Sequence, residues 1–183
     1  ARFELVREYF FEAAHRNTAG DARTTRLHGH NFRVRVVLEG PIEPERGWFI
    51  DYADVDAAVR PELDRLDHRC VNDVVGAPNA RTADIAAWLE NRLRPVLPRL
   101  RRVLVTTGAE PGFRPSRLPS DPALDYPERL AFGIEVAHRL TAVAEGHKCG
   151  GVHGHGFRVE TGADDLERLE PALREVHETL DHR

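Results

Sequence analysis

The sequence predicts an α+β fold, in which antiparallel strands form a sheet that helices cover on one face. Three observations lead to this prediction. The expected elements run strand, strand, helix, helix, strand, then strand, strand, helix. Short links join the paired strands, and part of this order recurs with the same short motifs. With 183 residues, 41% of them hydrophobic, the chain is long enough for one large domain or two small ones.

The first half supplies most of the expected elements. Residues 2–15 and 31–40 have β-branched and aromatic residues in partial alternation, which is typical of strands. A helix is expected over 54–68 and another over 80–97, before a third strand at 101–107. The apolar positions that share one face of these helices are Val55, Val59, Leu63 and Leu66, then Ile85, Leu89 and Leu93. Pro95 disturbs the end of the second helix.

The second half begins after a proline-rich stretch, "PGFRPSRLPSDPALDYP", which predicts a linker. Strands are expected at 129–138 and 156–160, followed by a helix. The apolar stripe of that helix is predicted to hold Leu166, Leu169, Leu173, Val176 and Leu180. We therefore expect a first unit over residues 1–112, a linker over 113–127, and a partial second unit over 128–183.

Three motifs occur twice, in the same order. "FFEAAH", "RLHGHNFRVRV" and "LDRLDHR" are matched later by "FGIEVAH", "GVHGHGFRVE" and "HETLDHR". Eight of the ten histidines occupy positions that the two copies share. His147 and His177, the latter being the first residue of "HETLDHR", have no histidine counterpart, and we expect them to be solvated surface residues. The sequence therefore predicts a tandem, partly degenerate duplication.

The repeated histidines have the pattern of metal ligands. His28 and His30 point to the same face of a strand, because side chains alternate along it, and His15 ends the preceding strand. Three neutral imidazoles suit zinc and leave one coordination position open, as catalytic zinc sites do. The second copy repeats the set as His138, His153 and His155. Hydrogen-bonded sheet histidines without metal are the plainer alternative.

Composition excludes several classes of function. The net charge is −4 with no long run of like charges, which argues against a nucleic-acid partner. No stretch is apolar enough to serve as a membrane span or a secretory signal, so we expect no membrane partner and a cytoplasmic location. The two cysteines do not form a disulfide framework. Cys70 is expected to be a buried residue at a helix end.

The motifs "AAH", "LHGHNF", "DY", "LDHR" and the helix "AAWLENRL" together resemble the 6-pyruvoyl-tetrahydropterin synthase family, which includes the 6-carboxytetrahydropterin synthases of queuosine biosynthesis. The resemblance covers residues 1 to about 107 as a nearly complete unit and 128–183 as a partial one. It implies the T-fold, in which subunits join their sheets into a barrel. It also implies a homo-oligomer whose active sites lie between subunits.

The resemblance further implies a zinc-dependent carbon–carbon or carbon–oxygen lyase whose small-molecule substrate is a dihydropterin triphosphate. Its three zinc histidines correspond to the two trios named above. Its proton-abstracting cysteine corresponds to Cys149 alone. Its Asp-His proton relay corresponds to Asp67 and His68, and again to Asp181 and His182. Because family sites lie between subunits, we expect Cys149 to meet Asp67 and His68 across an interface.

The sequence departs from the family pattern at several positions. Thr24 stands at the cysteine position of the first copy, and Thr106 at the place of the glutamate that anchors the pterin ring. The second copy ends without a second helix or a ring-anchoring strand. Two further functions therefore remain open: a non-catalytic or repurposed zinc-binding T-fold protein that recognises a purine- or pterin-like ring, and a duplicated enzyme with a new substrate.

Overall fold

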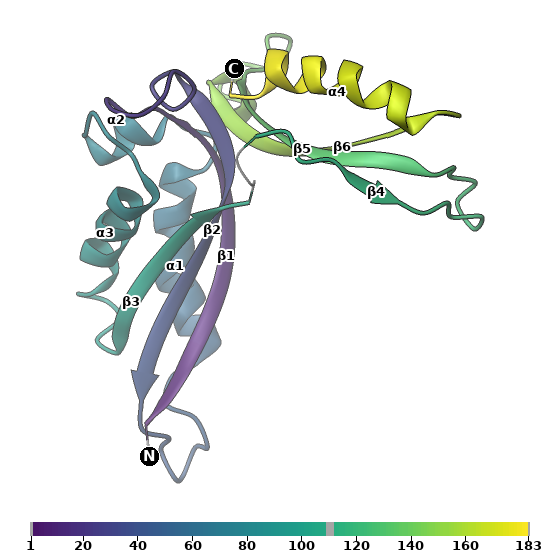
Figure 1. The fold of residues 1–183 in the computed structure, drawn as a ribbon. Coiled ribbons are helices and arrows are strands. Elements are labelled where there is room, and N and C mark those ends of the chain that lie inside the picture. Colours follow the sequence, from purple (N-terminus) through teal and green to yellow (C-terminus); the bar gives the residue numbers. More distant parts are fainter. Residues whose placement is uncertain (1, 109–111, 183) are drawn as a thin grey trace.

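The structure is a computed structural model that describes residues 2–108 and 112–182. It contains two three-stranded antiparallel sheets, the first with three helices on one face and the second with one (Figure 1). The predicted α+β class is confirmed. Residues 109–111, at the predicted end of the first unit, lie outside the described residues, as do the outermost residues 1 and 183 of the two predicted units.

The first sheet has the order β1-β2-β3 and three helices on one face (Figure 1). Its strands are β1 (Phe3–His15), β2 (His28–Gly40) and β3 (Leu100–Thr107), and its helices are α1 (Tyr52–Leu66), α2 (Val71–Val75) and α3 (Thr82–Leu93). The seven apolar positions predicted to face inward from α1 and α3 are all buried. They pack with Phe11, Phe32 and the inward-facing valines of β2 in the main hydrophobic core.

The second sheet has the order β4-β5-β6. Its elements are β4 (Ser116–Leu118), β5 (Arg129–His138), β6 (His153–Gly162) and α4 (Leu166–Leu180). The stretch predicted to be a linker therefore contains a short strand, which pairs antiparallel with β5. The core of this part is small, with Leu130, Phe132, Ile134, Leu166 and Leu173 as its buried residues.

Helix α4 buries the predicted face only in part: Leu166, Leu169 and Leu173 pack in the core as predicted. Val176 and Leu180 are 42% and 43% exposed, whereas His177, expected at the surface, is only 4% exposed. The ring of His177 packs against Phe113 and Phe132, with centroids 5.5 and 6.1 Å away. The predictions for Val176, Leu180 and His177 were wrong, because the true buried stripe takes a polar residue that periodicity counts as exposed.

The two sheets meet at the ends of β2 and β6 that carry the His-Gly-His motifs, and the units form an L in Figure 1. Gly29 and Gly154 lie in backbone contact there. A Cβ on Gly29 would clash with the Cα of Gly154 and would lie 2.8 Å from the carbonyl oxygen of Val136. Beside this crossing, Asn31 accepts a hydrogen bond from the Gly156 N–H (3.1 Å) and donates one to the Gly156 carbonyl (3.3 Å). The close approach of strands β2 and β6 therefore requires glycine at both positions.

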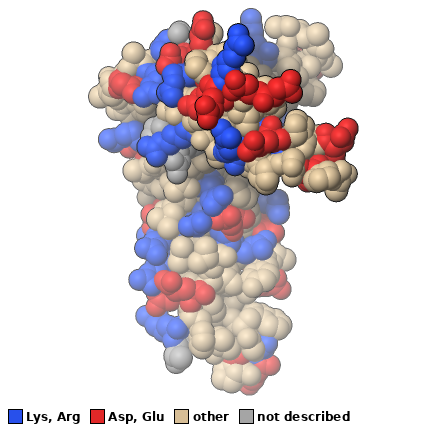
Figure 2. Space-filling view, turned by 45° about the vertical axis from the view of Figure 1, so that its right-hand side comes forward, with Lys and Arg blue, Asp and Glu red and all other residues tan. Residues whose placement is uncertain are grey.

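Acidic and basic side chains are interspersed over the face shown in Figure 2, in keeping with the mixed charge of the sequence. Within the part of the chain that the structure describes, no helix is long and apolar enough to cross a membrane.

We predict that Gly29→Ala destabilises the protein by about 2 kcal/mol or more, because the added methyl group meets backbone that has no room to move. Thermal and urea denaturation would measure the loss. Gly133→Ala is the matched control: it also lies in a strand, but its Cβ would meet only Phe157 O, at 3.9 Å. Equal stability of the two variants would contradict the close crossing.

Candidate functional site

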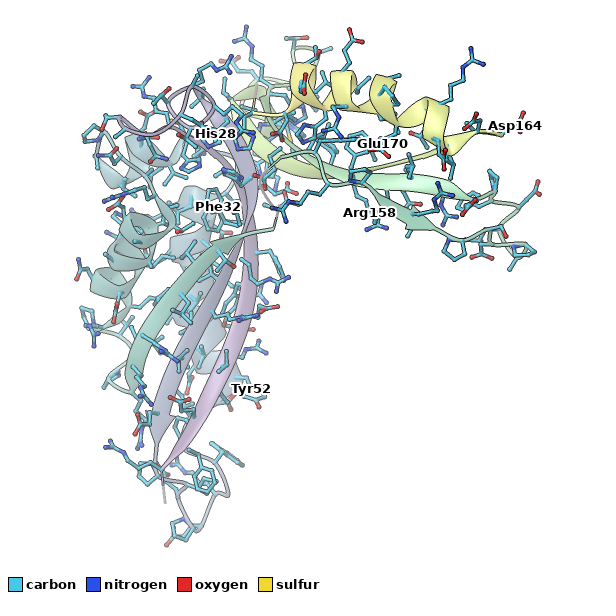
Figure 3. The ribbon with its side chains drawn as sticks, in the orientation of Figure 1. His28, Phe32, Tyr52, Arg158, Asp164 and Glu170 are labelled. Carbon is cyan, nitrogen blue, oxygen red and sulfur yellow. The ribbon has the colours of Figure 1, made fainter. Side chains whose placement is uncertain are left out.

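The first histidine trio lies at the junction of the two sheets. His15 at the end of β1 pairs with His28 at the start of β2, and His30 follows on the same face. The three ring centroids lie 4.4 to 4.9 Å apart. All three side chains are buried, and their donor nitrogens lie within 4.8 Å of one another. Figure 3 shows His28 near the second sheet, with Phe32 further along the first.

The rings of the first trio are oriented and neutral. His15 Nδ1 lies 2.6 Å from the Ala80 carbonyl oxygen, and His28 Nδ1 lies 2.8 Å from that of Arg26. Nδ1 is thus the protonated nitrogen, which leaves Nε2 with a free lone pair. Burial lowers the pKa of His15 and His30 to about 3 and that of His28 to about 4. His15 Nε2 is buried with no hydrogen-bond partner among the described residues, as an atom that binds a metal would be.

The second trio occupies the equivalent positions in the other sheet. His138 at the end of β5 pairs with His153 at the start of β6, and His155 follows. Their ring centroids lie 4.6 to 4.9 Å apart. His153 Nδ1 lies 2.9 Å from the Gly151 carbonyl oxygen. The Nε2 atoms of His138 and His153 are buried and lack a hydrogen-bond partner in the described part of the chain. Burial lowers the pKa of both rings.

Each trio receives a histidine from the opposite unit. His68, which follows α1, stacks on His153 with centroids 4.5 Å apart, and its donor nitrogen groups with those of His153 and His155. His182, which follows α4, lies 4.9 Å from the ring of His28. At the second site, the donor atoms that lie within 4.8 Å of one another thus belong to His68, His153 and His155, with His68 in place of His138. The junction therefore brings the Asp-His motif of each half to the His-Gly-His motif of the other.

The same local geometry aims both histidines across the junction. His68 and His182 have left-handed backbones, with φ of 57° and 58°. The His68 N–H donates to the Glu12 carbonyl (2.6 Å), and the His182 N–H donates to the Glu135 carbonyl (2.5 Å). The preceding aspartates accept hydrogen bonds from the N–H groups of these same glutamates, at 3.0 and 2.9 Å. The aspartate therefore anchors each turn to its own sheet, while the imidazole projects toward the other.

Asp67 also connects the first unit to the cysteine segment. Its Oδ2 lies 3.0 Å from Lys148 Nζ and 2.9 Å from His68 Nδ1. Burial alone would raise the pKa of Asp67, but the Glu12 N–H, Lys148 and His68 outweigh it and lower the pKa. A pocket of about 350 Å³ opens here, lined by Phe10, Phe11, Glu12, Asn31, Asp67, His68 and Lys148.

Cys149 follows Lys148 in a short 3₁₀ turn and is partly buried. Its N–H donates to His147 Nδ1 (3.1 Å), and its carbonyl accepts from the Leu140 N–H (2.8 Å). Its sulfur belongs to none of the donor groups found among the described residues. Among the described residues, it is the neighbouring Lys148 that contacts Asp67, within one chain. The expected meeting of Cys149 with Asp67 and His68 across an interface stays a prediction. Cys70 is only partly buried and precedes α2.

The first site differs at the positions where the sequence departs from the family pattern. The Thr24 hydroxyl donates to the Asp21 carbonyl (3.2 Å) in its own loop. On β3, Thr106 pairs with Arg33 and Thr107 pairs with Phe32. Because paired residues share a face, Thr107 is the threonine on the histidine face of the sheet, whereas Thr106 points to the opposite face.

Sequence reasoning missed the glutamates at this junction. Glu12 Oε2 lies 2.9 Å from His155 Nδ1, and Glu135 contacts His30 Nδ1. Both occur three residues before the first histidine of their copy, in "EAAH" and "EVAH", which is the signal that could have revealed them. Each glutamate points to the face of its strand that is opposite to its own trio, so its contacts become visible only where the two sheets meet.

Comparison with known proteins identifies the first unit. The model of the 6-pyruvoyl tetrahydropterin synthase family matches residues 4–110. A dihydroneopterin monophosphate aldolase of Pyrococcus furiosus is 36% identical over 89 residues, which are 47% of this chain and 75% of the relative. A 6-carboxy-5,6,7,8-tetrahydropterin synthase of Synechocystis is 33% identical over 94 residues, 49% of this chain and 73% of the relative.

Solved structures of similar fold come from the same group. The 6-pyruvoyl tetrahydropterin synthase of Caenorhabditis elegans has a TM-score of 0.49 and 21% identity, covering 60% of this chain and 97% of that one. The enzyme of Plasmodium vivax has a TM-score of 0.45 and 18% identity, covering 89% of this chain and 99% of that one.

We predict that the metal-free protein loses stability as the pH falls from about 7 to about 5. Folding lowers the pKa of His15, His28 and His30, so below the ordinary value of 6.5 the unfolded chain takes up protons that the folded chain refuses. The loss should be on the order of 1–2 kcal/mol per histidine at pH 5. Urea denaturation across this range would measure it. His28→Gln should flatten the dependence, whereas His147→Gln at the exposed surface should not; a flat wild-type profile would contradict the prediction.

Proposed function

We propose, since the chain belongs to the 6-pyruvoyl tetrahydropterin synthase family, that it is a zinc-dependent lyase acting on the side chain of dihydroneopterin triphosphate. Family membership supports the coarser part of this proposal, a pterin-metabolising enzyme of the lyase class. The finer proposal rests chiefly on one observation: a histidine trio, an Asp-His pair and the cysteine segment gather at one junction.

The histidines suit zinc in number, orientation and charge. His15, His28 and His30 would hold one ion, and His138, His153 and His155 a second. The buried Nε2 atoms without partners support this assignment, because an unpaired buried nitrogen is costly unless something binds it. Bound zinc would hold the hydroxyl groups of the substrate side chain and stabilise the negative charge that develops there.

The second trio belongs to the working site in this proposal. Cys149 is the base that removes a proton from the substrate side chain. Asp67 and His68, which come from the first unit, return and relay protons, and Asp67 holds Lys148 beside the cysteine. The first site, with Thr24 held in its own loop, has no thiol and would bind its metal without catalysing the reaction. Asp181 and His182 are the corresponding pair there.

The proposal includes an ancestral tandem duplication. It is supported by the equal strand register of the two trios and by the matching turns at His68 and His182. Of the two reaction types, cleavage of the side chain to a 6-carboxytetrahydropterin is favoured, because one relative is named for that product and another is named an aldolase.

We also propose a cytoplasmic homo-oligomer. In the first sheet β1 and β3 are edge strands, and unpaired edges invite further strands. Val6 and Phe10, on the face of β1 away from the helices, are 54% and 61% exposed. Other copies of the chain would cover them.

A second candidate function is a zinc-binding protein that recognises a purine- or pterin-like ring without catalysing the family reaction. The observation that favours it is the missing ring-anchoring glutamate, at whose place the resemblance puts Thr106. Thr107, the neighbouring β3 residue on the histidine face, also offers only a hydroxyl, whereas a carboxylate would pair with ring N–H groups. Incubating the zinc-loaded protein with dihydroneopterin triphosphate and assaying for acetaldehyde and for released triphosphate would separate the candidates. Ring binding without either product would favour the second.

For the enzyme we predict that Cys149→Ala lowers kcat by at least about 100-fold with little change in stability, because a general base is lost. Thr24→Ala, at the equivalent position of the first copy, is the control and should keep nearly full activity. Steady-state kinetics on dihydroneopterin triphosphate would measure both. Undiminished activity of Cys149→Ala would refute the assignment.

The crossed arrangement gives a further prediction. His68→Gln should reduce kcat strongly, whereas His182→Gln should reduce it only slightly, because His68 faces the site with the thiol. If the relay instead acted within one repeat, the two effects would be exchanged. Zinc content and thermal stability of both variants would show that neither change acts by unfolding.

A further inference from the structure

Two carboxylates at the junction reach across to histidines of the opposite half. Glu12 lies on β1, three residues before His15, so its side chain points away from its own trio. Its Oε2 lies 2.9 Å from His155 Nδ1 and 3.7 Å from His68 Nε2. In the other half, Glu135 is only 2% exposed, and its carboxylate contacts His30 Nδ1. The two contacts are reciprocal.

The two histidines that these glutamates contact are not among the trio histidines whose rings a backbone carbonyl fixes. In His15, His28 and His153, Nδ1 faces a carbonyl oxygen that fixes the ring. Among the described contacts, the outer nitrogens of His30 and His155 face a glutamate instead. These two are the second histidines of the two His-Gly-His motifs, so each trio has one ring whose orientation depends on the other half.

A carboxylate beside the outer nitrogen of a ligand histidine fixes which nitrogen carries the proton, orients the ring and makes the inner nitrogen a better donor. Loss of such a partner weakens metal binding by roughly 10- to 100-fold. A glutamate that merely filled space would not have this effect. Both glutamates also accept, through their backbone carbonyls, the N–H of the histidine that crosses the junction. Each glutamate thus acts twice on the site of the other half: its side chain orients a trio histidine there, and its carbonyl holds the histidine that crosses the junction.

We propose that Glu12 and Glu135 are positioning residues that orient His155 and His30 for metal binding, so that the metal affinity of each half depends on a carboxylate of the other. The inference rests on the proposed zinc sites and adds to them a coupling through the junction. Neither glutamate is assigned a place in the trios.

The experiment measures zinc affinity in the full chain, by competition with a chelating dye, without any pterin. In a chain carrying His28→Ala, which disables the first site, Glu12→Gln should weaken the remaining site by roughly 10- to 100-fold. Glu8→Gln is the matched control: Glu8 lies on the same face of β1 but pairs with Arg35 at the surface, and its change should leave the affinity as it was. In a chain carrying His153→Ala, Glu135→Gln should weaken the first site in the same way.

Several outcomes would overturn the proposal. Unchanged affinity on Glu12→Gln would do so, as would an equal loss at both sites in the otherwise unaltered chain, since a general structural effect would cause that. Replacing zinc by Co²⁺ tests the role itself: positioning leaves the visible bands of the ion in place, whereas their shift would make the glutamate a direct ligand. Glu12 is 37% exposed at its side chain, so its variant folds even where the change at buried Glu135 does not.

The outcome for function is separable. Two zinc sites with the predicted coupling, in a protein that leaves dihydroneopterin triphosphate intact, would refute the proposed reaction and support this inference. Catalysis by a protein whose zinc affinities do not change on substitution of Glu12 and Glu135 would support the proposed reaction and refute this inference. Absence of zinc binding in the unaltered chain would refute both.

Discussion

The contact of two backbones at Gly29 and Gly154 is the constraint on which the rest of this structure depends. Side chains normally keep crossing strands well apart, and here both side chains are absent at the point of crossing. The strands approach so closely that the histidines on either side of each glycine come within reach of the opposite unit. A motif whose flanking residues suit a metal site thus has, in its central residue, the means of joining two halves of a chain.

The energetic consequence appears at His68 and His182. A left-handed backbone at a residue other than glycine costs on the order of 1–3 kcal/mol. Each turn is held by the aspartate that precedes it and by the N–H of the histidine itself, both of which bond the same glutamate of the adjacent strand. These bonds compensate for the strain, and the strained residue can then point away from its own sheet. The strain that lets each imidazole project across the junction is therefore offset by hydrogen bonds within its own half.

Much of the fold followed from the sequence, and the failures have physical reasons. Helices α1 and α3 were predictable because Val55, Leu63 and Ile85 recur with the helical period and face one core. Helix α2 and strand β4 are too short to show a period. His177 was misplaced because it is buried against Phe113 and Phe132, two residues from other segments. No local pattern reports such a contact.

In the candidate site, too, some residues could be predicted from the sequence and others could not. Side chains alternate between the two faces of a strand, so the shared face of residues such as His28 and His30 could be predicted from their spacing. Glu12 and Glu135 were not, since their role depends on a contact between segments more than 100 residues apart. The contact of Asp67 with Lys148 was not expected either, because it joins two segments that lie far apart in the sequence.

The two halves depend on each other for different reasons. The core of the second unit contains five buried hydrophobic residues among those described, far fewer than the first. So small a core gives little stability of its own, and packing against the first unit compensates. The first unit has the larger core and matches the family model over residues 4–110, but Thr24 stands at the cysteine position of the family pattern. This unit contributes His68 and Glu12 to the site that has Cys149. The first half thus stabilises the second and also supplies His68 and Glu12 to it. In the opposite direction, the second half brings His182 and Glu135 to the first trio, and the glycine crossing is where these contacts are made.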